Sequence, residues 1–112
     1  MKFDFAQIPI QEIPAFKGGT GTALVRKYSD DVGDMVHITL PPGSSIGLHT
    51  HRGNCEIMYF LSGQGRCLDD GTEYAIAAGD FHYCPEGHSH SVINTGEEPL
   101  ILFGVLPKVK KP

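Results

Sequence analysis

The sequence predicts a single all-β domain, and three observations lead to that prediction. Gly and Pro together make up 22 of the 112 residues, against an ordinary usage of roughly 12%, so long helices are not expected. Short apolar runs recur along the chain with turn-forming residues between them, and residues 34–40 alternate in the manner of a half-buried strand. The length suits one hydrophobic core and leaves little room for a second domain. Together these features favour a β-sandwich or barrel.

The chain divides into an N-terminal arm, a barrel and a short basic tail. Residues 1–21 carry scattered apolar side chains interrupted by Pro9 and Pro14, so we expect an extended arm that packs on the barrel or on a partner subunit. Residues 108–112 form the basic tail. Residues 22–107 form the barrel, and its expected strands are Thr22–Lys27, Asp34–Leu40, Ile46–His51, Cys55–Leu61, Arg66–Leu68, Glu73–Ile76, Phe81–Cys84, Ser89–Ile93 and Leu100–Leu106.

The tripeptide Asp69-Asp70-Gly71 predicts a tight hairpin turn. Asp and Gly tolerate the left-handed backbone conformations that such a turn requires. We therefore expect the runs on either side of this turn to pair as antiparallel neighbours.

The run Cys55–Leu61 is apolar on both faces. A strand of this kind is ordinarily covered on both sides, whereas one face of a small isolated barrel meets water. A partner subunit that covers the outer face resolves this conflict. The sequence therefore predicts a homodimer, the commonest type of symmetric oligomer.

Charge, hydropathy and cysteine content exclude several classes of function. The formal net charge of −4 argues against nucleic-acid binding, which needs a basic surface. No apolar stretch approaches the roughly 20 residues that span a bilayer, and no signal peptide is recognisable at the N-terminus. The three cysteines are odd in number and show no C-x-x-C spacing, so we expect free thiols and a cytoplasmic location.

Histidines and one glutamate in the middle of the chain indicate a metal site. His49 and His51 lie two residues apart, which places both rings on one face of a strand. Glu56 shares its parity with the apolar Met58, so its side chain is assigned to the interior, and His90 lies on a later strand. Three imidazoles and a carboxylate suit one divalent Mn, Fe, Co, Ni, Cu or Zn ion. The alternative is that these are polar residues on exposed strand faces.

The same residues lie within two spaced patterns that resemble the two motifs of the cupin family. The first is Gly43-x5-His49-x-His51-x4-Glu56-x6-Gly63, and the second is Gly79-x5-Pro85-x-Gly87-x2-His90-x3-Asn94. The patterns cover residues 43–94, and every fixed position of both motifs is matched. The resemblance implies a double-stranded β-helix (jelly-roll) barrel in which His49, His51, Glu56 and His90 bind one divalent transition metal.

Residues near the motifs are assigned to structural roles. We expect His82 and His88 to be rim or surface residues, and Cys84 to be a small core residue. Asn94 is expected to tie a turn through its side chain. The apolar wall of the ligand pocket is expected to comprise Met58, Phe60 and Phe103.

The sequence favours a small metal-dependent enzyme of unspecified reaction, with one alternative. A metal held in this way polarises a small oxygen-rich ligand such as an oxyacid, an enol or a sugar. The resemblance is to a family that includes metal-dependent dioxygenases, decarboxylases, lyases and isomerases, but no separate acid–base pair stands out, so no catalytic residue is assigned. The alternative is a non-catalytic cupin that binds or senses a small molecule.

Overall fold

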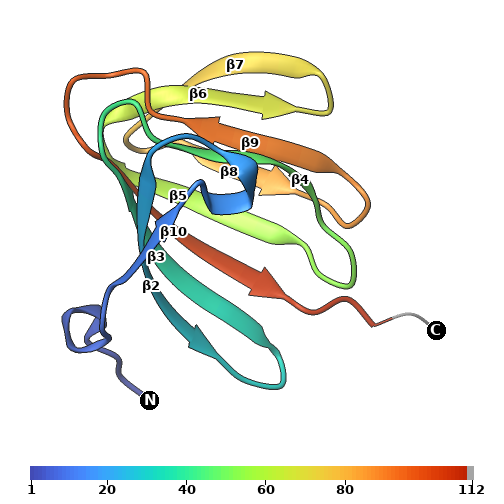
Figure 1. Ribbon diagram of the computed structural model, residues 1–112. Helices are drawn as coiled ribbons and strands as arrows, with labels where there is room; N and C mark the ends of the chain where they lie inside the picture. Colours follow the sequence, from blue (N-terminus) through green and yellow to red (C-terminus); the bar gives the residue numbers. More distant parts are fainter. Residues whose placement is uncertain (111–112) are drawn as a thin grey trace.

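The computed structural model describes residues 1–110 and contains two antiparallel β-sheets that face one another (Figure 1). The larger sheet has the strand order β1-β2-β3-β10-β5-β8, and the smaller sheet has the order β4-β9-β6-β7. The smaller sheet lies at the top of Figure 1. The strands are β1 (Gln11–Pro14), β2 (Thr22–Ser29), β3 (Gly33–Leu40), β4 (Ser45–Thr50), β5 (Glu56–Ser62), β6 (Gln64–Asp69), β7 (Thr72–Ala77), β8 (Phe81–Cys84), β9 (Ser89–Ile93) and β10 (Leu100–Pro107). This architecture confirms the predicted all-β jelly-roll barrel.

Each strand expected within the barrel is present, with ends that differ by at most two residues from the prediction. The turn between β6 and β7 is also confirmed. Asp70 and Gly71 have φ values of 46° and 86°, as a two-residue type I′ turn requires. This turn fixes the register of the hairpin, in which Asp69 pairs with Thr72.

The N-terminal arm contains a strand that the sequence reasoning missed. β1 pairs with β2 and becomes the outer strand of the larger sheet, where Pro14 is tolerated because an edge strand has unpaired positions. Arg26 on β2 holds the preceding segment by donating hydrogen bonds to the carbonyl oxygens of Phe5 (3.2 Å), Ala6 (3.1 Å) and Ile8 (2.5 Å). The arm is therefore tied to the sheet of its own chain.

The helical segments of residues 1–110 are two short 3₁₀ turns, η1 (Phe5–Gln7) and η2 (Phe16–Gly18). No helix in this part of the chain is long and apolar enough to cross a membrane. The last two residues of the expected basic tail, 111–112, lie outside the described residues.

The hydrophobic core fills the space between the two sheets. On β5, Met58 and Phe60 are fully buried and point inward, whereas Ile57 and Leu61 point outward, as the alternation of a strand requires. Glu56 shares the inward parity and is 4% exposed. The core therefore places an ionisable side chain at one end of an otherwise apolar row.

The outer face of β5 and β8 is apolar and exposed. It is formed by Ile57, Leu61, Phe81 and Tyr83, of which Phe81 is 73% exposed. The arm covers another part of the same sheet, since Phe5 packs against Phe103 of β10 with ring centroids 5.6 Å apart. Exposed apolar patches of this kind mark interaction sites.

We expect a second copy of the chain to cover this outer face. Replacing Phe81 with Glu then places a charge in the interface and shifts the protein from dimer to monomer, because an unpaired buried charge is costly. Light scattering coupled to size-exclusion chromatography measures the change. Val32→Glu is the matched control, because Val32 is 72% exposed but lies in the β2–β3 turn. A wild-type protein that is monomeric throughout contradicts the prediction.

Candidate metal centre

Four side chains from three strands and one loop converge at one end of the barrel interior. His49 lies on β4, Glu56 begins β5 and His90 lies on β9, while His51 directly follows β4. His49 and His90 are cross-strand partners. One potential ligand atom from each of the four residues lies within 4.8 Å of all the others. The structure thus brings together all four residues that the sequence reasoning proposed as ligands.

The centre of the cluster is His90, which is completely buried. Its Nε2 atom is 2.9 Å from Nε2 of His51 and 3.1 Å from Nε2 of His49. The same atom is 3.1 Å from Oε1 of Glu56, and His51 Nε2 is 3.2 Å from that oxygen. Three ring nitrogens and one carboxylate oxygen therefore face a common point.

Hydrogen bonds behind two of the rings decide which nitrogen faces the cluster with a lone pair. Nδ1 of His49 donates to the carbonyl oxygen of Gly47 at 2.7 Å, and Nδ1 of His51 donates to Oδ1 of Asn54 at 2.8 Å. With the proton on Nδ1, the Nε2 atom of each neutral ring carries a lone pair. Lone pairs and a carboxylate this close repel one another unless a cation lies between them. The donor set therefore fits a divalent transition metal.

The electrostatics of the cluster keep its carboxylate ionised. Burial alone raises the pKa of Glu56, but without a metal, hydrogen bonds that His51 and His90 donate when their Nε2 atoms carry a proton outweigh it and bring the pKa from 4.5 to about 2. The hydrogen bond to Glu56 raises the pKa of His51, although burial opposes this shift. Burial lowers the pKa of His49. The cluster thus attracts positive charge, and at neutral pH Glu56 is available as an anionic ligand.

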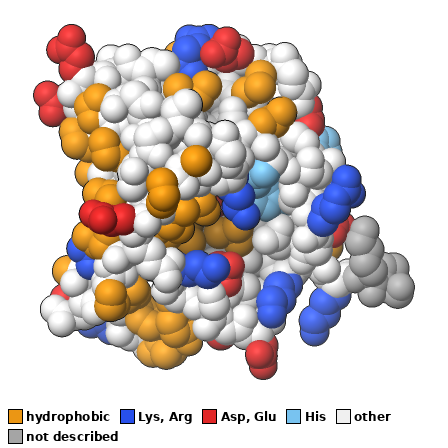
Figure 2. Space-filling model, in the orientation of Figure 1, with side chains coloured by type: hydrophobic (Ala, Val, Ile, Leu, Met, Phe, Trp, Pro, Cys, Tyr) orange, Lys and Arg blue, Asp and Glu red, His pale blue; other side chains and the backbone are white. Residues whose placement is uncertain are grey.

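The cluster opens into a cavity of about 380 Å³ that His49, His51 and Glu56 help to line. Figure 2 shows the hollow, with hydrophobic side chains on its floor and cationic side chains and a histidine at its edge. The cations in the lining are Lys17, Lys27 and Arg52. The sequence reasoning did not assign these three residues to the pocket. They come from η2, β2 and the loop after β4, and only the fold brings them together.

The 3₁₀ turn η2 lies directly against β4 beside the cluster. A Cβ atom on Gly47 would lie 2.2 Å from the carbonyl oxygen of Lys17, so only glycine permits this approach. The close contact positions Lys17 at the cavity, and the charge of Lys17 opposes protonation of His51. The arm is therefore part of the pocket.

The prediction that Met58, Phe60 and Phe103 form the apolar wall of the pocket is wrong. Met58 and Phe60 lie in the core between the sheets, and Phe103 packs under Phe5 on the outer face. The strand alternation correctly placed the first two inside the barrel but did not indicate which part of the interior is hollow. The apolar wall comes mainly from the arm and from β2, β3 and β4, and comprises Ile13, Phe16, Val25, Val36, Ile38 and Ile46.

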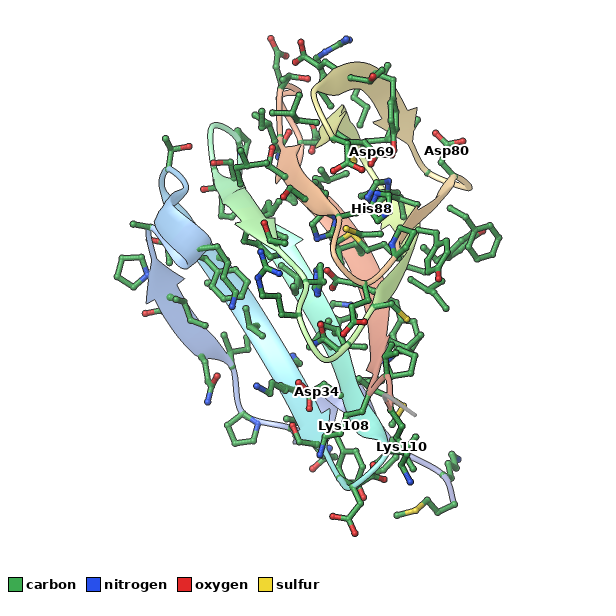
Figure 3. All side chains as sticks on the ribbon, turned by 90° about the vertical axis from the view of Figure 1, so that its right-hand side faces the viewer. Asp34, Asp69, Asp80, His88, Lys108 and Lys110 are labelled. Carbon is green, nitrogen blue, oxygen red and sulfur yellow. The ribbon has the colours of Figure 1, made fainter. Side chains whose placement is uncertain are left out.

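The two further histidines have different environments. His88 is exposed, as expected, and its Nδ1 atom is hydrogen-bonded to the carboxylate of Asp70. It lies in the upper part of Figure 3, near Asp69. His82 is only 3% exposed, so its assignment to the rim or surface is wrong. The signal was available, because His82 and the confirmed core residue Cys84 share the inward parity of β8.

Residues 36–106 match the family model of the cupin domain. The chain is a cupin. A solved cupin, described as RmlC-like and from Shewanella frigidimarina, superposes with a TM-score of 0.76 at 20% identity, covering 99% of this chain and 92% of the other. A structure described as a predicted oxalate decarboxylase from Thermotoga maritima superposes with a TM-score of 0.92 at 33% identity, covering 97% of this chain and 100% of the other.

Two relatives of this cupin carry names that refer to oxalate. An oxalate-binding protein of Thermotoga maritima is 48% identical over 72 residues, which are 64% of this chain and 60% of the relative. An oxalate decarboxylase of Bacillus subtilis is 34% identical over 73 residues, which are 61% of this chain and 19% of the relative. The matched segments thus span less than two thirds of either relative.

Proposed function

We propose that this cupin holds one divalent transition metal through His49, His51, Glu56 and His90 and binds a small oxyacid of the oxalate class in the adjoining cavity. The observation behind the proposal is the position of the cluster at the wall of a cavity that also presents lysine and arginine side chains. An ion with four protein ligands keeps coordination positions for an outside oxygen ligand when it is six-coordinate.

The charges in the cavity favour an anion over a neutral sugar or enol. Lys17, Lys27 and Arg52 contribute three positive charges, and Asp34 is the one acidic residue in the lining besides Glu56. Lys27 is 3.7 Å from Asp34, which offsets one of these charges. A small dicarboxylate therefore meets the metal on one side and cationic side chains on the other.

The oxalate-binding and oxalate decarboxylase relatives support the same chemical class. Decarboxylation is the second candidate, and the Bacillus subtilis relative favours it. In that reaction the C–C bond of hydrogen oxalate breaks and carbon dioxide leaves, while the remaining carboxyl carbon takes up a proton and its hydroxyl group loses one, which gives formate. Glu56 is poorly suited as a proton donor, because its carboxyl group is ionised. We therefore favour binding and assign no catalytic residue. We further propose that the protein is a cytoplasmic homodimer.

Calorimetric titration of oxalate into Mn²⁺-loaded protein tests the proposal. We expect saturable binding that weakens by at least about tenfold, or about 1.4 kcal/mol, when the protein is stripped of metal. Acetate is the control ligand, because its single carboxylate offers one end for recognition and not two. Equal affinity for oxalate with and without metal contradicts the proposal. Formate in the reaction mixture supports the second candidate.

A further inference from the structure

On the side of the buried His90 ring that faces away from the metal cluster, a series of hydrogen-bonded side chains begins. Nδ1 of His90 is 2.9 Å from Nε2 of His82. On the far side of that ring, Nδ1 of His82 is 2.5 Å from the hydroxyl oxygen of Tyr74. The Tyr74 hydroxyl donates in turn to Oδ2 of Asp69 at 3.3 Å. The two imidazole planes differ by only 16°, which is compatible with a hydrogen bond in the plane of both rings.

The partner of His90 differs in kind from those of the other two histidines in the cluster. The carbonyl oxygen behind His49 and the amide oxygen behind His51 can only accept a hydrogen bond. The ring nitrogen of His82 can accept or donate, so this contact alone leaves the proton of His90 undecided between Nδ1 and Nε2. Which nitrogen of His90 carries the proton therefore depends on the hydrogen bonds farther along the series, which ends at Asp69.

Asp69 is the one group in this hydrogen-bonded series that cannot donate a hydrogen bond when it is ionised. If Asp69 accepts from Tyr74, the Tyr74 oxygen is free to accept from Nδ1 of His82. Nε2 of His82 then carries a lone pair and accepts from Nδ1 of His90. Each side chain in this series then donates to the next one toward Asp69. Nε2 of His90 is left with a lone pair that faces the cluster.

We propose that Asp69, acting through Tyr74 and His82, is a positioning residue that holds His90 in the tautomer able to bind a metal. This inference rests on the metal site proposed above. It assigns a role to three residues outside the four ligands, and two of them, Tyr74 and Asp69, lie on the neighbouring strands β7 and β6.

Burial and position support the assignment. His82 and His90 are 3% and 0% exposed, so water does not compete for their hydrogen bonds and each bond polarises the next. Burial, reinforced by Cys67 and Asp69, raises the pKa of Tyr74, which keeps its hydroxyl proton available for donation.

The hydrogen-bonded series of side chains also lies apart from the cavity. His82, Tyr74 and Asp69 are not among the residues that line it. In Figure 3, Asp69 lies in the upper part of the molecule, whereas the cavity residue Asp34 lies in the lower part. Substitutions of Asp69, Tyr74 or His82 are therefore expected to leave the lining of the ligand cavity unchanged.

Zn²⁺ affinity, measured by competition with a chelator, tests the proposal in the purified full-length protein. We expect Tyr74→Phe and Asp69→Ala each to weaken Zn²⁺ binding by about tenfold, the lower end of the effect of losing an outer hydrogen-bond partner. Tyr83→Phe is the matched control, because Tyr83 adjoins His82 on β8 but is 56% exposed. Its affinity should equal that of the wild type.

A rescue variant separates this role from a general effect on folding. In His82→Gln, an amide oxygen accepts directly from His90, as Asn54 does from His51. Zn²⁺ affinity should therefore stay near the wild-type value, and adding Tyr74→Phe to His82→Gln should cause no further loss. Long-range ¹H–¹⁵N spectra of the Zn²⁺ form should show the proton of His90 on Nδ1.

The outcomes distinguish this inference from the proposed function. If the wild type binds Zn²⁺ and both Tyr74→Phe and Asp69→Ala bind it equally well, the positioning role is overturned and the metal site stands. The role is also overturned if Tyr74→Phe weakens binding as much in the His82→Gln background as it does alone. If the wild type binds no Zn²⁺, the metal site and the positioning role both fail.

Discussion

Replacing His90 with Ala should remove nearly all metal from the purified protein, which otherwise contains about one ion per chain. His90 Nε2 lies within 3.1 Å of a potential ligand atom on each of the other three residues, so its loss opens the centre of the site. We expect metal affinity to fall by more than about 100-fold, beyond the loss caused by removing an outer partner. Elemental analysis after dialysis measures the metal content.

Two further variants test whether the metal is lost because a ligand is missing or because the protein has unfolded. His49→Ala alters a ligand that is only half-buried, and Glu56→Gln preserves the size of the side chain while removing its charge. Both should lose metal while circular dichroism stays that of the wild type. His88→Ala is the control, because His88 is exposed and pairs with Asp70 outside the cluster. Full metal content in both His49→Ala and His90→Ala shows that the site assignment is wrong.

Asn94→Ala should lower the free energy of unfolding by about 3 kcal/mol. The side chain of Asn94 is 2% exposed. Its Nδ2 atom donates to the carbonyl oxygens of Leu40 (2.8 Å) and Glu98 (2.9 Å), and its Oδ1 atom accepts from the backbone N–H of Gly96 (2.9 Å). Alanine leaves these three backbone groups without their partner, and each such loss in a buried place costs about 1–3 kcal/mol.

Urea denaturation of the metal-free protein measures this effect without a contribution from bound metal. Thr95→Ala, at the exposed neighbouring position, should change the free energy of unfolding by no more than about 0.5 kcal/mol. A change equally small for Asn94→Ala would show that water replaces the three hydrogen bonds. The same measurement tests the expectation that Asn94 ties a turn, which the three bonds already confirm.

The strands and the metal cluster could be predicted because both depend on local regularities. Strand alternation placed Glu56 and Met58 on the inner face, and the motif spacing brought His90 to the same point as His49 and His51. Both types of signal operate over a few residues or within a spaced pattern, so a single sequence is enough to detect them.

The missed features depend on contacts between distant segments. β1 was not recognised because Pro9 before it and Pro14 at its end are typical of a loop, and its stability comes from pairing with β2. Lys17 reaches the cavity only because η2 packs against Gly47. The burial of His82 was detectable from parity, but its link to Tyr74 requires the two sheets to face one another. Packing of this kind leaves no mark on spacing in the sequence.

The division of the four ligands between the sheets has a consequence for how the domain opens. His49 and His90 belong to the smaller sheet and Glu56 to the larger, while His51 lies in the connection that passes between them. An ion held by all four is a cross-link between the two layers. Separation of the layers must break the coordination shell, so the binding free energy opposes any opening that parts them. We therefore expect metal loading to couple the two sheets into one cooperative unit.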